Sequence, residues 1–191
     1  SAASDVYKRQ ITAKGNLKMT NLEKIQKVMR VLQILSKIIL IFAIVGVILA
    51  SIGATLVASD VLNTENQFLH FISVTAEMSK GQIVGTLTAA AVSLLFGGII
   101  TAFVYRYFTA ELKEGTPFTN AGADKIKQLG IIEIVLSVIS MGIVDGIYEK
   151  IGLAEWNRFD DAGGITLGIC LILLAMVVRY GAELEQKTRT K

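Results

Sequence analysis

The stretch "VMRVLQILSKIILIFAIVGVILASIGATLVA" (residues 28–58) decides the fold class. It is almost wholly apolar, and it is longer than the roughly 20 residues that a helix needs to cross about 30 Å of hydrocarbon. Three further runs, at residues 83–108, 129–148 and 163–180, have the same character. The sequence therefore predicts an all-α integral membrane protein, a four-helix bundle with spans at about these four positions.

The first 18 residues differ from the rest. "SAASDVYKRQ" (residues 1–10) back-translates into the end of a transposase adaptor used for sequencing libraries, so we interpret it as translated adaptor. Lys14-Gly15 can be encoded by a purine-rich run that resembles a bacterial ribosome-binding site before Met19. We predict that residues 1–18 are adaptor plus translated leader, and that residues 19–191 form a single four-span domain starting at Met19. An ordinary polar tail is the alternative for residues 11–18.

The charge balance depends on that assignment. The whole chain has 19 Lys and Arg against 16 Asp and Glu. Residues 1–18 contain four of the basic residues and one of the acidic ones, which leaves 15 of each. A near-neutral chain gives no electrostatic reason to predict direct binding of nucleic acid.

Basic residues gather on one side of the predicted spans. That side has twelve: Lys24, Lys27, Arg30, Lys37, Arg106, Lys113, Lys125, Lys127, Arg179, Lys187, Arg189 and Lys191. The other side has only Lys80, Lys150 and Arg158. Because short loops rich in Lys and Arg stay in the cytoplasm, we expect a multi-pass protein of the bacterial inner membrane with both termini cytoplasmic.

The two outer segments resemble membrane-interface structure. Residues 66–78, "NQFLHFISVTAEM", place apolar side chains along one side of a helix that could lie in the headgroup layer. Residues 148–161 carry Tyr148, Trp156 and Phe159, which suit an aromatic belt. Short interfacial helices are therefore expected outside the membrane.

The inner loop "ELKEGTPFTNAGADKIKQLG" (residues 111–130) has clear boundary signals. Gly115 can end one helix, Pro117 prevents its continuation, and Thr119 can cap the next helix. We interpret Gly115, Pro117, Phe118 and Thr119 as a candidate partner-binding loop, together with the tail at residues 181–191.

Small residues recur at four-residue spacing in the spans. They let helix backbones approach closely in lipid, where there is no hydrophobic drive for association. Packing within the chain is the simpler use, and a homodimer face is the alternative. The predicted helix-packing residues are Gly46, Ala50, Ala54, Gly85, Ala89, Ser93, Gly97, Gly164 and Gly168.

An internal similarity links the two halves. "VYRYFTAELKE" (residues 104–114) and "VVRYGAELEQ" (residues 177–186) match with one gap, and both would leave the membrane on the inside. The chain could therefore consist of two similar helical hairpins. The alternative is that inner-boundary segments share Arg and Tyr for anchoring.

The sequence offers little catalytic chemistry. One His and one Cys do not suffice for the usual zinc sites or a Cys–His pair, and no phosphate loop, dinucleotide fingerprint or nucleophile elbow is present. We predict no catalytic, cofactor or metal site, and not an enzyme. Cys170, in the middle of the last span, is interpreted as a packing residue.

Glu133 is the intramembrane acid. An ionisable group inside a span is a candidate functional residue, and Lys37 of the first span lies at a depth suited to pair with it. The alternative is that both side chains reach the inner interface as a structural pair.

Two motifs resemble a known family. "EGTPFTNAGADKIKQLG" (residues 114–130) and "RYGAEL" (residues 179–184) resemble segments of the bacterial membrane family catalogued as domain of unknown function 2975. The ending "EQKTRTK" matches the acidic continuation of that family only in part. The resemblance implies four transmembrane helices. It also implies, by gene neighbourhood, a small helix-turn-helix regulator as partner.

Two functions follow as expectations. The first is a non-catalytic membrane protein that regulates or binds a cytoplasmic protein, such as a small helix-turn-helix regulator, through its inner loop at residues 109–128 and its tail at residues 181–191. The alternative is a small dimeric transporter or resistance-type pump that uses Glu133.

Overall fold

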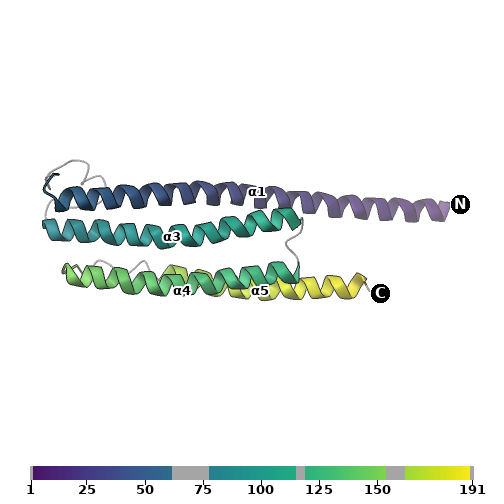
Figure 1. The fold of residues 1–191 in the computed structure, drawn as a ribbon. Coiled ribbons are helices and arrows are strands. Elements are labelled where there is room, and N and C mark those ends of the chain that lie inside the picture. The colour runs from purple at the N-terminus through teal and green to yellow at the C-terminus, as the bar shows by residue number, and fades with distance from the viewer. Residues whose placement is uncertain (1, 62–77, 115–118, 154–161, 190–191) are drawn as a thin grey trace.

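Four long helices make up the described part of the chain. The computed structural model describes residues 2–61, 78–114, 119–153 and 162–189. The helices are α1 (Ala2–Ala58), α3 (Lys80–Glu114), α4 (Asn120–Lys150) and α5 (Ala162–Arg189) (Figure 1). No strand occurs in these ranges. The described chain is therefore all-α, as the sequence predicts.

All four helices are long and apolar enough to cross a membrane. The shortest has 28 residues and the longest 57, against the roughly 20 that one crossing needs. Helical structure fits such sequences because hydrocarbon offers the backbone no hydrogen-bond partners, so the N–H and C=O groups must pair within the helix. The length and composition of the four helices confirm the prediction of several membrane-spanning helices. Helix α1 includes residues 2–18, whose interpretation as adaptor and leader stays a prediction.

The helices pack in the order of the chain. Helix α1 packs against α3, α3 against α4, and α4 against α5. Within the described residues, no Cα of α1 lies within 8 Å of a Cα of α4 or α5. No Cα of α3 lies within 8 Å of a Cα of α5 either. The contacts are thus those of two hairpins, α1–α3 and α4–α5, joined along α3 and α4, rather than of helices surrounding one shared core. Both chain ends lie at the same end of the hairpins (Figure 1).

The buried core is small. Val57, Ile83, Leu87 and Met78 form its main cluster, where α1 meets the start of α3. Many large apolar side chains stay exposed instead, for example Phe42 at 71% and Val177 at 67%. Exposed apolar surface on this scale is unusual for a soluble protein and suits helices that face lipid.

Glycines bring α4 and α5 into close contact. A Cβ atom at Gly130 would lie 2.6 Å from the carbonyl oxygen of Gly168, and one at Gly168 would lie 2.7 Å from the carbonyl oxygen of Gly130. No other residue fits at either position without separating the helices. Gly168 therefore lies at a helix contact, as its predicted packing role requires.

The other predicted packing residues take several environments. A Cβ at Gly46 would meet Leu94 of α3 at 2.8 Å, and one at Gly85 would meet Ile151 at 2.6 Å. Ala89 is buried, whereas Ala50 and Ala54 of α1 are half-buried. Ser93, Gly97 and Gly164 line a cavity between helices. A homodimer face stays a prediction.

Several sequence predictions fall outside the described residues. These are the interfacial helix at residues 66–78, except for Met78, and the aromatic positions Trp156 and Phe159. The two-hairpin arrangement is observed, but whether the hairpins arose by duplication stays a prediction.

The contact between Gly130 and Gly168 leads to a stability prediction. Gly168→Ala should lower the free energy of unfolding in detergent by about 1–3 kcal/mol, because the new methyl group forces the α4 and α5 backbones apart. Gly142→Ala is the matched control, since a Cβ there meets nothing within 4 Å. Thermal unfolding followed by circular dichroism measures both variants. Equal stability of the two variants would contradict the close contact.

Candidate functional site

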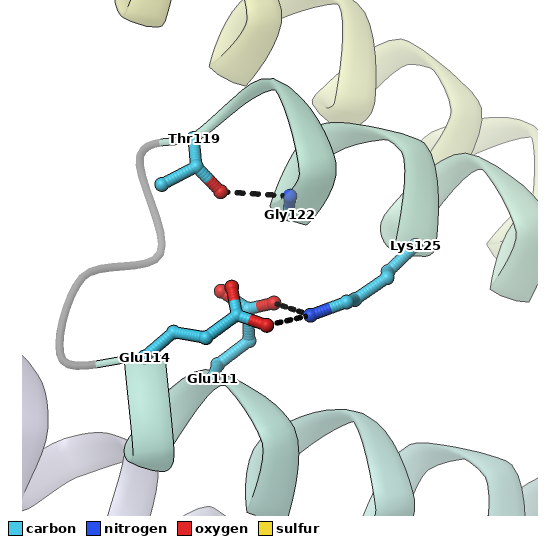
Figure 2. Close-up of polar contacts among 5 residues, drawn as sticks. All are labelled: Glu111, Glu114, Thr119, Gly122 and Lys125. Atoms are coloured by element: carbon cyan, nitrogen blue, oxygen red, sulfur yellow. Dashed lines mark hydrogen bonds and ion pairs between the residues drawn. The ribbon is translucent and has the colours of Figure 1, made fainter.

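An ion-pair cluster joins α3 and α4 at the end of the molecule that the sequence assigns to the cytoplasm. Lys125 Nζ lies 3.1 Å from Oε1 of Glu111 and 2.6 Å from Oε1 of Glu114 (Figure 2). The two carboxylates are one turn apart, near the end of α3, and the ammonium comes from the second turn of α4. Lys125 therefore links the two helices on either side of residues 115–118.

Glu111 is the most buried member of this cluster. Its side chain is 0% exposed, while that of Lys125 is 32% exposed. Oε2 of Glu111 is buried and has no hydrogen-bond partner among the described residues. A buried carboxylate is costly without a compensating charge, so Glu111 depends on Lys125. Lys125 lies before the apolar run at residues 129–148, outside the predicted span. The hydrogen bond that its ammonium donates to Glu114 raises the pKa of the ammonium most, and the bond to Glu111 raises it further.

Thr119 caps α4. Its backbone is extended, with φ −124° and ψ 156°, and its side-chain oxygen accepts a hydrogen bond of 2.9 Å from the backbone N–H of Gly122 (Figure 2). This is the usual N-cap geometry, which satisfies a backbone donor that the helix leaves free. The sequence prediction for Thr119 is confirmed. Gly115, Pro117 and Phe118 lie outside the described residues.

Helix α5 joins the same end through a second ion pair. Arg179 of α5 donates to Asp124 of α4, and the two side chains are 46% and 53% exposed. An exposed pair contributes little to stability, and this one connects α5 to the inner end of α4. The exposed charged side chains near these helix ends form one surface, which we call the inner face and define by Glu114, Asp124, Lys125 and Arg179, with Glu111 buried beneath it.

Glu133 lies near the middle of α4 and is only 7% exposed. Its Oε1 atom lies 3.5 Å from where a Cβ at Gly164 of α5 would be. No ion pair or hydrogen bond of its side chain occurs among the described residues. A carboxyl group at this depth, without a protein partner, is an expensive arrangement that a purely structural role does not require.

The predicted pairing of Glu133 with Lys37 is wrong. Lys37 is exposed on α1, and no Cα of α1 lies within 8 Å of α4 in the described chain. Helix α3 packs between the two, so matching depth in the sequence does not bring these side chains together. Lys37 therefore has no described role at a site.

A cavity of about 180 Å³ lies between α3, α4 and α5, and Glu133 is not among the residues that line it. It is lined by three serines and two glycines among other residues: Ser93, Phe96, Gly97, Ile100, Leu136, Ser137, Ser140 and Gly164. Gly164 is the lining residue that approaches Glu133, because a Cβ at Gly164 would lie 3.5 Å from Oε1 of Glu133. From the sequence, Ser93 was predicted only as a packing residue, and Ser137 and Ser140 were missed. Their positions about one and two turns beyond Glu133 on α4 were the available signal.

No group of three or more His, Cys, Asp or Glu residues in the described part of the chain could hold a metal ion. Cys170 is a free thiol on the exposed surface of α5. The interpretation of Cys170 as a packing residue does not hold among the described helices, because its side chain is exposed.

No family model, curated protein or solved structure matches the chain. The resemblance to the family of domain of unknown function 2975 stays a prediction.

The Glu111–Lys125 pair leads to a second stability prediction. Lys125→Met should cost about 3 kcal/mol of unfolding free energy, because it leaves a fully buried carboxylate without its counter-charge. Adding Glu111→Gln to the same chain should restore part of that loss, since the buried charge is then removed. Equilibrium unfolding in mixed micelles measures each variant. Arg179→Gln is the control and should cost less than about 1 kcal/mol, because its pair with Asp124 is exposed.

Proposed function

We propose that this chain is a non-catalytic membrane protein that binds a cytoplasmic protein through its inner face. The observation that carries the proposal is that ion pairs tie the ends of three helices together at one end of the molecule. A surface held in one arrangement loses little conformational entropy when a partner binds. The exposed charges around it, among them Lys113 and Lys127, supply electrostatic selectivity.

The partner class comes from the sequence resemblance rather than from the geometry. A small helix-turn-helix regulator is the candidate, held at the membrane by the inner face. Under this proposal the chain itself does not contact nucleic acid, because its charge without residues 1–18 is balanced.

The proposal requires the inner face to lie in the cytoplasm of a bacterial inner membrane. The distribution of Lys and Arg supports this orientation, since the basic residues gather at the inner-face ends of the helices. In that orientation the cytoplasmic side would hold the α3–α4 ion-pair cluster, the Asp124–Arg179 pair and both termini.

Orientation can be tested with single cysteines in a chain in which Cys170 is replaced by Ala. A membrane-impermeant maleimide added to intact spheroplasts should label Lys150→Cys and leave Lys113→Cys unlabelled, because these exposed positions lie at opposite ends of the helices. After lysis, both should react. Labelling of Lys113→Cys in sealed spheroplasts would reverse the orientation and place the inner face outside.

Partner binding can be tested without disturbing the ion pairs. We expect Lys113→Glu with Lys127→Glu to abolish crosslinking of a small DNA-binding protein in native-host membranes, because the charge of the exposed surface is reversed. Lys150→Glu, at the opposite end of α4, is the matched control and should leave the crosslink intact. Mass spectrometry of the crosslinked product identifies the partner. Recovery of only the protein itself from unaltered membranes would contradict the proposal.

A second function, a small dimeric transporter or resistance-type pump, has one observation in its favour. Glu133 is buried near the middle of α4 and has no partner among the described residues. Membrane carriers use such acids as coupling sites. The two functions separate cleanly, because Glu133→Gln should abolish a transport phenotype and leave partner crosslinking unchanged.

A further inference from the structure

We infer that the groove between α1 and α3 binds one acyl chain of an anionic phospholipid, whose phosphate contacts Lys37 and Arg106. The groove has a volume of about 330 Å³, and all the residues that line it are apolar. Lys37 and Arg106 do not line it. They lie just beyond the end of the groove that is nearer the inner face, where a lipid headgroup would be.

The shape of the groove suits a hydrocarbon chain. Its deepest residues are small, because Ala43 and Gly98 are buried and a Cβ at Gly98 would lie 3.4 Å from that of Ala43. Two larger lining residues, Ile44 and Leu95, stay 53% and 50% exposed, so the groove is open on one side. On α1 its lining extends over residues 40–48, which is about 12 Å along the helix. That length is most of one leaflet, which is about half of a 30 Å hydrocarbon core.

The charge pattern places Lys37 and Arg106 at the membrane boundary. No charged residue occurs at positions 38–59 on the α1 side or at positions 81–105 on the α3 side. A helical run of the first length rises about 33 Å, which is close to the thickness of the hydrocarbon core. Lys37 and Arg106 are therefore the first charged side chains of α1 and α3 at the inner boundary, where the phosphates of lipids lie.

The register of α1 against α3 brings the two basic residues to the same level. Gln33 donates a hydrogen bond of 2.8 Å to Thr109, and the two helices run antiparallel (Figure 1). Lys37 is four residues after Gln33. Four residues before Thr109 is Tyr105, which is the chain neighbour of Arg106. Lys37 and Arg106 are thus at matching depth on adjacent helices.

Both basic residues also share a helix face with the groove. Lys37 comes three residues before Leu40 and seven before Ile44, and Arg106 comes four residues after Ala102. Residues three, four or seven apart lie on one face of a helix. Lys37 is about 4.5 Å along the axis from Leu40, and Arg106 is about 6 Å from Ala102. Both side chains are exposed, so a lipid with its chain in the groove can place its phosphate between them.

The positive charge of this pair has no partner in the described part of the chain. Lys37 and Arg106 form no ion pair there, and the acids at the end of α3, Glu111 and Glu114, are both paired with Lys125. Arg and Lys bind phosphate oxygens through charge-assisted hydrogen bonds, and basic groups between helices on the cytoplasmic side recognise anionic headgroups. A zwitterionic lipid carries its own positive charge, so it complements the pair less well. The charge therefore selects an anionic phospholipid such as phosphatidylglycerol.

This inference goes beyond the partner binding proposed above and does not rest on it. It requires only that α1 and α3 span a membrane. It also gives Lys37, which does not reach Glu133, a role at the lipid boundary.

The test is native mass spectrometry of the purified full chain, titrated in detergent with dioleoyl phosphatidylglycerol or dioleoyl phosphatidylcholine. We expect one phosphatidylglycerol to bind tightly per chain, about tenfold more tightly than phosphatidylcholine. Lys37→Gln with Arg106→Gln should weaken phosphatidylglycerol binding about tenfold and leave phosphatidylcholine binding unchanged, because only the phosphate contacts are lost. Ala102→Phe should weaken binding of both lipids, since the ring fills part of the groove.

The matched control is Lys127→Gln with Lys150→Gln, which removes two exposed basic charges from α4, a helix with no Cα within 8 Å of α1 in the described chain. It should bind phosphatidylglycerol like the unaltered chain, as should Lys37→Arg with Arg106→Lys, which keeps both charges. Gel filtration and circular dichroism establish that each variant is folded.

Three results would overturn the lipid site. The folded chain could bind the two lipids equally, the doubly neutralised chain could bind phosphatidylglycerol as well as the unaltered one, or glycerol phosphate without acyl chains could displace the lipid. A fourth is a disulfide between two copies of an Ile44→Cys chain that also carries Cys170→Ala, formed in phosphatidylglycerol vesicles. That crosslink would show that a second copy of the chain, and not a lipid, covers the groove.

Discussion

The structure depends on the contact between α3 and α4, because in the described chain it is the only contact that joins the two hairpins. Lipid provides no hydrophobic drive for such a contact, so it must come from close packing and polar interactions. At the inner end that polar interaction is the Glu111–Lys125 pair, in which the carboxylate is fully buried. The arrangement holds both hairpins in register and fixes the position of every group on α4 relative to α3.

The same two helices carry the two regions with chemistry. Lys125 and Glu133 lie two turns apart on α4, while Glu111 and Ser93 lie on α3, so the inner face and the serine-lined cavity share one scaffold. A partner that binds the inner face would therefore contact helices that also shape the cavity. The exposed apolar surface of α1, by contrast, is suited to lipid. Gln33 of α1 donates a hydrogen bond of 2.8 Å to Thr109 of α3.

Close approach of α4 and α5 accounts for the unusual environment of Glu133. Gly130 and Gly168 allow the two backbones to touch, which brings Gly164 next to Ser137 and Glu133. A larger residue at any of these glycines would separate the helices or fill the space beside the carboxylate. The small residues thus serve two purposes, because some provide helix contacts and others, such as Gly97 and Gly164, leave a cavity open.

The sequence by itself determined the helical class, the four apolar helices and the Thr119 cap, because these depend on the length of apolar runs and on local hydrogen bonding. It also identified Glu133 as unusual, since an acid in an apolar run is visible without a structure. Only the tertiary structure decided which helices touch. It placed α3 between α1 and α4, which separates Lys37 from Glu133, and it brought Ser93, Ser137 and Ser140 to one cavity. The reason is physical: in lipid every apolar helix face is equally soluble, so hydropathy cannot specify neighbours. Which helices become neighbours is instead determined by a few close contacts and buried charged pairs between residues that are far apart in the sequence.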